Sequence, residues 1–99
     1  MAIYTYDDDF VVGSVDETEL DKAEADAILE VSMLNVVDEY YIEKSVKAKT
    51  LATLCLHQLE NDGMDFKYKA YIKDFDRYVS LAKTDSSTSN ISTIPIARG

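Results

Sequence analysis

The chain has 99 residues, of which 46% are hydrophobic, with three Gly and one Pro, and this composition indicates one helix-rich globular domain and excludes a disordered chain. The net charge of −9 is concentrated in residues 1–43, which carry thirteen carboxylates against Lys22 alone, whereas residues 44–99 carry nine basic and six acidic side chains. That distribution disfavours nucleic-acid phosphates near the first half and favours head-to-tail contact between copies.

Residues 1–15 are predicted to form an extended segment, with the acidic triplet Asp7-Asp8-Asp9 as a turn or exposed loop. Adjacent carboxylates suggest Ca²⁺, but a calcium loop needs oxygens at alternating positions, a Gly and a distant Glu, and that spacing is missing here. We therefore expect no metal site. The chain begins without a basic leader and contains no apolar run of about 18 residues, so we expect neither a signal peptide nor a membrane span.

The first long helix is predicted to begin between Gly13 and Thr18, where capping boxes starting at Ser14 or at Thr18 compete. Its inner stripe consists of Leu20, Ala23, Ala27, Ile28, Val31 and Leu34. The carboxylates expected on its other faces are Asp21, Glu24, Asp26 and Glu30. A break is predicted at residues 35–38, because two valines lie there between Asn35 and Asp38, whose side chains compete for backbone hydrogen bonds.

Residues 44–60 are predicted to form a central helix, followed by a turn at residues 61–63. Its apolar positions recur at helical spacing and cover a wide stripe, so this helix needs neighbours on more than one side. A lone Cys55 in such a stripe is interpreted as a reduced core residue. Cys55 and His57 are two positions apart and point in different directions, which disfavours a nucleophile and base pair. We therefore predict no enzymatic activity and no cofactor.

A third helix is predicted over residues 65–83, antiparallel to the second, because aromatic and aliphatic side chains recur there every three or four positions. Lysines beside these tyrosines could suggest nucleic-acid binding, but a pI of 4.4 opposes that interpretation.

Residues 84–99 change character and are predicted to leave the helix as a polar linker and an extended C-terminal arm. Pro95 keeps the residue before it extended, so the isoleucines around it have the shape to lie in a groove or along a sheet edge. A frayed terminus is the alternative. The predicted partner-binding residues are Ile91, Ile94, Pro95, Ile96 and Arg98. The predicted fold is thus all-α: an extended segment (1–15), a bundle of three to four helices (16–83) and an extended arm (84–99).

The order of these features resembles the head-tail connector, or adaptor, proteins of tailed bacteriophages. The likeness covers residues 16–99 and is one of layout and length: an acidic first helix, a central helix rich in small residues (KTLATLCLH, residues 49–57), a turn, an aromatic helix and a polar arm.

The resemblance implies a structural virion protein, made in the host cytoplasm, that forms a ring of twelve copies beneath the portal at the head-tail interface. In that family the arm reaches neighbouring portal and tail-completion proteins, and DNA passes through the ring without specific binding. A negative lining would repel phosphate, and head-to-tail contacts close rings.

A second hypothesis is a small acidic inhibitor that mimics nucleic acid and blocks a DNA- or RNA-binding enzyme. Such a mimic needs carboxylates at phosphate-like intervals on one exposed face and acts as a monomer or dimer. The connector hypothesis instead needs charges shared between subunits of a ring.

Overall fold

The computed structural model describes the backbone of residues 2–91 and the side chains of residues 2–83. This part of the chain contains four helices and no strand, which confirms the predicted all-α class. The helices are α1 (Asp9–Gly13), α2 (Glu17–Ser32), α3 (Glu39–Leu56) and α4 (Met64–Ile91). Among residues 2–91, no helix is long and apolar enough to cross a membrane.

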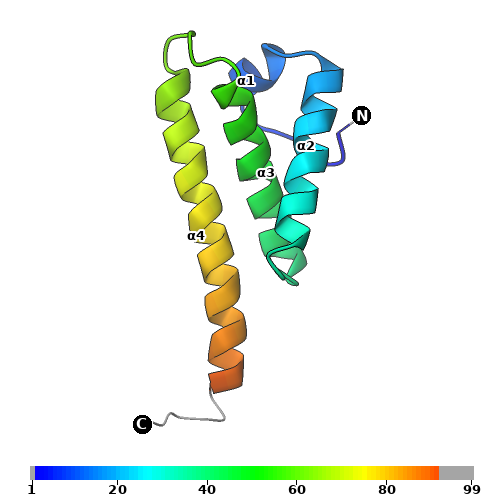
Figure 1. Cartoon of the computed structure of the whole chain (residues 1–99), viewed down its shortest axis with the longest axis vertical. Helices are drawn as coiled ribbons and strands as arrows, with labels where there is room; N and C mark the ends of the chain where they lie inside the picture. The colour runs from blue at the N-terminus through cyan, green and yellow to red at the C-terminus, as the bar shows by residue number, and fades with distance from the viewer. Residues whose placement is uncertain (1, 92–99) are drawn as a thin grey trace.

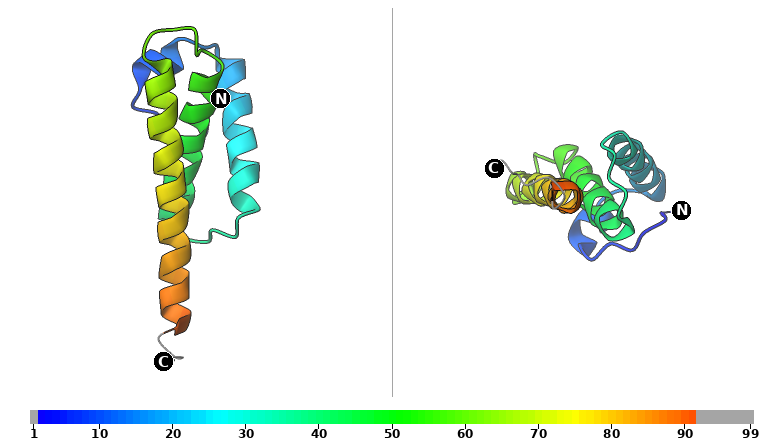
Figure 2. Two further views of the ribbon diagram at one scale, coloured as in Figure 1. Left: turned by 60° about the vertical axis from the view of Figure 1, so that its left-hand side comes forward. Right: turned by 90° about the horizontal axis from the view of Figure 1, so that it is seen from below.

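The three long helices run antiparallel to their neighbours in the chain, with α3 between α2 and α4 (Figure 1). Seen along the long axis, α1 and the N-terminal segment lie beside α3, outside the row of long helices (Figure 2). The central helix therefore has neighbours on several sides, as its wide apolar stripe predicts.

Two groups of buried side chains form the core, and α3 contributes to both. The group nearer α1 consists of Val11, Ala23, Leu51, Leu54, Cys55 and Met64. The group nearer the connection between α2 and α3 consists of Ala27, Val31, Val36, Val46, Ala48, Phe75 and Ala82. The Cys55 thiol is free and buried, which agrees with its interpretation as a core residue.

The helix boundaries follow from capping side chains. Asp16 begins α2 by accepting a hydrogen bond from the Glu19 amide at 2.8 Å, so the start lies within the predicted interval but uses neither predicted capping box. The predicted break between α2 and α3 is confirmed, and Asn35 there adopts a φ of 62°. Asn tolerates this left-handed conformation better than most residues. At the other end, Gly63 has a φ of 85° and precedes α4.

The predicted boundaries at α1 and at both ends of α3 were wrong. Residues 9–13 are helical where an extended piece was expected, because the Asp8 carboxylate caps the Val11 amide at 3.1 Å and the Val11 side chain is buried. The central helix spans residues 39–56 and not 44–60. Asp38 caps it five residues earlier, and the backbone turns after Leu56, which leaves Leu56 and Leu59 exposed.

The largest correction concerns the C-terminal arm, because α4 continues to Ile91 where a linker was predicted from residue 84. No Gly or Pro interrupts residues 84–91, and extending an existing helix does not require a new nucleus. The low helix propensity of Ser, Thr and Asn costs only about 0.5 kcal/mol per residue.

Candidate functional site

Glu24 on α2 binds the N-terminal segment and is only 3% exposed. Its carboxylate accepts hydrogen bonds from the Ile3 amide (2.7 Å), the Tyr4 amide (3.0 Å) and the Tyr6 hydroxyl (2.6 Å). The prediction that Glu24 lies on an outer face was therefore wrong. Its spacing was informative, since it lies three and seven residues before the buried Ala27 and Val31.

The surroundings of the Glu24 carboxylate favour the neutral form of Tyr4 and Tyr6. Burial, together with the Glu24 carboxylate, raises the pKa of the Tyr6 hydroxyl. Burial and the nearby Glu43 also raise the pKa of Tyr4. Both side chains therefore remain protonated hydrogen-bond donors at neutral pH.

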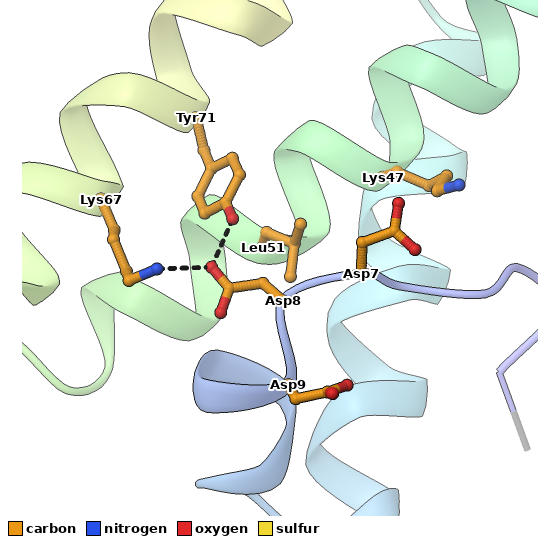
Figure 3. Close-up of a pocket in the computed structure, with 7 residues that line it drawn as sticks. All are labelled: Asp7, Asp8, Asp9, Lys47, Leu51, Lys67 and Tyr71. Carbon is orange, nitrogen blue, oxygen red and sulfur yellow. Dashed lines mark hydrogen bonds and ion pairs between the residues drawn. The ribbon is translucent and has the colours of Figure 1, made fainter.

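A second set of contacts, which we call the Asp8 joint, attaches the same N-terminal segment to α4. Besides capping α1, the Asp8 carboxylate accepts from the Lys67 ammonium at 2.8 Å and from the Tyr71 hydroxyl at 2.5 Å (Figure 3). Burial alone would raise the pKa of Asp8, but the bonds from Lys67, Tyr71 and the Val11 amide outweigh it and hold this pKa below its ordinary value. Burial and the Asp8 carboxylate conversely raise the pKa of Tyr71.

An open hollow surrounds the Asp8 joint, with a volume of about 520 Å³. Its lining residues are Asp7, Asp8, Asp9, Lys47, Leu51, Lys67 and Tyr71. Figure 3 shows Asp7 directed towards Lys47, Asp8 towards Lys67 and Tyr71, and Asp9 pointing elsewhere. The acidic triplet therefore does not converge on one point, and the described residues contain no group of three His, Cys, Asp or Glu side chains that could hold a metal ion.

Several of the side chains that line the hollow bind one another and hold the N-terminal segment against α4, which is a structural role. Asp8 has its oxygens engaged by α1 and α4, and Lys47 lies 3.5 Å from the Glu43 carboxylate. The nearby Cys55 is buried, and burial followed by the Asp8 charge raises its thiol pKa, which makes it a poor nucleophile. His57 is exposed on the surface and lies 3.2 Å from Glu19.

The acidic first half has structural roles that composition alone did not reveal. At least seven of its thirteen carboxylates cap helices, bind the N-terminal segment or pair with a basic side chain. The capping residues are Asp8, Asp16 and Asp38, Glu24 is the anchor described above, and the pairs are Glu19 with His57, Glu30 with Lys49 and Glu43 with Lys47.

The predicted partner-binding residues fall at and beyond the end of α4. Ile91 is the last residue of this helix. Ile94, Pro95, Ile96 and Arg98 lie outside the residues that the structure describes. The structure therefore replaces the expected linker with helix and leaves the role of the isoleucines as a prediction.

The structure also reveals an exposed apolar surface that was not predicted from the sequence. Four large hydrophobic side chains are exposed where α2 passes into α3, and we name them the α2–α3 patch: Leu29, Met33, Val37 and Tyr40. Leu29 and Met33 are one helical turn apart and outside the inner stripe of α2, which was a readable signal.

The chain matches no protein-family model, no curated protein and no solved structure. Its function is therefore inferred from its own geometry.

Proposed function

We propose that this chain is a structural virion protein, a head-tail connector or adaptor that assembles as a ring under the portal. Its C-terminal residues contact neighbouring proteins in that assembly. The order of its helices, described above, supports this assignment, and the projection of α4 is the observation that carries it.

The helix α4 has 28 residues and α3 has 18, so α4 is longer by about 15 Å at 1.5 Å per residue. Figure 1 shows its C-terminal part projecting past the end of α2 and α3. The sequence of this projection, TDSSTSN at residues 84–90, consists mainly of weak helix formers. A helix of that composition gains stability from a packing partner, which a neighbouring subunit or portal supplies.

The charge of the long helices also suits contacts between copies. The helix α2 carries six carboxylates and one lysine, with Glu24 buried and Glu19 and Glu30 paired with side chains of α3 or of its C-cap residue, whereas α4 carries five basic and four acidic side chains. These two helices lie on opposite flanks of α3 (Figure 2). The acidic α2 flank of one copy therefore attracts the α4 flank of the next copy. Contact between two different faces is the heterologous kind that closes rings.

The competing hypothesis of a nucleic-acid mimic receives less support. A mimic must present its carboxylates to a partner, but at least seven of the thirteen in the first half are used in caps, anchors and ion pairs. The capping and anchoring groups are occupied by backbone amides, so they are poor substitutes for a regular phosphate array.

The test is the native mass of the intact chain, measured by light scattering and native mass spectrometry, alone and with the portal protein of the same phage. We expect a closed ring, or a monomer that joins a ring once portal is added. A monomer indifferent to portal, which instead competes with DNA for a nucleic-acid-binding enzyme, would overturn the connector proposal in favour of the mimic.

A further inference from the structure

We propose that the α2–α3 patch of one copy receives the segment 91–98 of a second copy. This inference rests on the proposed self-assembly and adds to it the surface that accepts the C-terminal residues.

The patch combines apolar area with a border that is mainly acidic, although Lys44 lies 5.5 Å from the centre of the Tyr40 ring at its α3 end. Its most exposed member is Val37, at 77%, in the connection between α2 and α3. Three exposed carboxylates, of Asp26, Asp38 and Glu39, come from the last two turns of α2, the connection and the first residue of α3. An exposed apolar surface with a charged border has the character of a protein-binding site.

The segment 91–98 has the complementary chemistry. It contains three isoleucines and Arg98, and no carboxylate side chain. Pro95 excludes a regular helix through this part of the segment, and an extended chain places Ile94 and Ile96 on the same side. The isoleucines match the apolar area of the patch, while the guanidinium of Arg98 matches its acidic border.

The length of the chain favours a second copy over the same chain. Ala82 packs in the same core group as Val36, which places this level of α4 beside the patch. Ile91 lies nine residues further along the helix, about 14 Å beyond that level. Three extended residues span only about 10 Å, so Ile94 falls short of the Val36 level of its own chain, and only Ile96, five residues on at about 17 Å, could reach it. Both isoleucines together therefore cannot lie on the patch of the same chain. The segment of a neighbouring copy starts from a different position, so the short length of chain after Ile91 does not keep it from the patch.

The first experiment compares self-association of full-length variants by analytical ultracentrifugation. Val37→Asp places a charge in the patch, and the double variant Ile94→Asp/Ile96→Asp places charges in the segment. Each should raise the dissociation constant of self-association at least tenfold. The controls are Phe66→Asp, which is equally exposed at 77% but lies at the opposite end of α4, and Thr93→Asp. These controls should stay within about twofold of the wild type.

The second experiment mixes the two defective variants. The Val37→Asp chain keeps an intact segment, and the Ile94→Asp/Ile96→Asp chain keeps an intact patch, so an equimolar mixture should form a one-to-one heterodimer. This heterodimer should not grow further, because its remaining patch and segment both carry the new charges. Formation of the heterodimer also demonstrates that both variants are folded.

The inference would be overturned if the mixture remained two separate monomers, if Phe66→Asp impaired association as strongly as Val37→Asp, or if the wild type were a monomer whose segment crosslinked only to its own patch. If the wild type is an oligomer and none of the four variants changes its self-association, the inference is overturned but the proposed function is not. A wild type that remains monomeric with and without portal would overturn the proposed function as well.

Discussion

Two buried or half-buried carboxylates secure the N-terminal segment, one at each end. Glu24 fixes residues 3–6 against α2, and Asp8 fixes the start of α1 against α4. Each accepts three hydrogen bonds, so each satisfies polar groups that would otherwise lose water without compensation. The segment is therefore held by these two side chains as well as by the apolar contacts of Tyr4, Tyr6 and Val11.

Replacing Glu24 with Ala should release this segment. Because bonds to a charged group contribute about 1.5–3 kcal/mol each, and the freed amides recover water, we expect a net loss of about 2–4 kcal/mol. Hydrogen exchange should show faster exchange of the Ile3 and Tyr4 amides. Asp26→Ala, at an exposed position of the same helix, should change stability by less than about 0.5 kcal/mol. Unchanged protection of both amides in Glu24→Ala would contradict the anchoring role.

The Asp8 joint should make stability depend on acid pH. The pKa of Asp8 is lowered from 3.8 in the folded protein, so its contribution is fully present above that value and is lost as pH falls through the folded pKa. Asp8→Asn should therefore be less stable than wild type at pH 7 by about 1–2 kcal/mol, since the carboxylate is 11% exposed and partly screened. Urea unfolding should show this gap closing below about pH 4.

The matched control for this pH dependence is Asp9→Asn, whose side chain is exposed and points away from Lys67 and Tyr71 (Figure 3). Its stability difference from wild type should stay small at every pH. A gap for Asp8→Asn that is the same at pH 7 and pH 2.5 would show that the joint acts through packing and not through charge.

At the scale of elements, the connections between helices depend on two residues in left-handed conformations, Asn35 and Gly63. The first lies in the predicted break between α2 and α3, and the second ends the turn before α4. A turn that reverses the chain within a few residues needs such a conformation, which L side chains adopt at a cost.

The two glycines nearest the helix ends give a matched test of this requirement. A Cβ atom added at Gly63 or at Gly13 would meet no atom within 4 Å, so steric contacts do not distinguish them. Only Gly63 has a positive φ, of 85°. Thermal unfolding should show Gly63→Ala less stable by about 1 kcal/mol and Gly13→Ala neutral or up to about 1 kcal/mol more stable. Equal shifts in both variants would contradict this explanation.

The elements that sequence reasoning predicted well are those with long apolar periodicity. The stripe through Ala23, Ala27 and Val31 located α2, and the wide stripe around Leu54 identified a helix with several neighbours. The errors came from local capping and from tertiary contacts. Nothing in a linear pattern shows that Asp8 meets Lys67, 59 residues away, or that the segment needs Glu24 as an acceptor.

At the scale of the whole molecule, the charge asymmetry of the sequence remains, but many of the carboxylates that cause it have structural roles. The helix that carries six of the first-half carboxylates, α2, lies on the side of α3 opposite to α4 (Figure 2). The predicted binding residues beyond Ile91 lie outside the described chain, so their role stays a prediction. The α2–α3 patch was missed because the periodicity was used only to identify the inner face of α2. The spacing of Leu29 and Met33 outside that face was visible, but their proximity to Val37 and Tyr40 depends on the chain reversal between α2 and α3.

The Asp8 joint also orders events during synthesis on the ribosome. Residue 8 is made early, but its partners Lys67 and Tyr71 follow 59 and 63 residues later. Because these partners must leave the exit tunnel before they can meet Asp8, α2 and α3 can pair while the N-terminal segment is still fastened only at Glu24. The first part of the chain to be translated is therefore attached to α4 only after Lys67 and Tyr71 have emerged, and until α4 emerges the core group around Val11 lacks its contacts with Met64, Tyr68 and Tyr71.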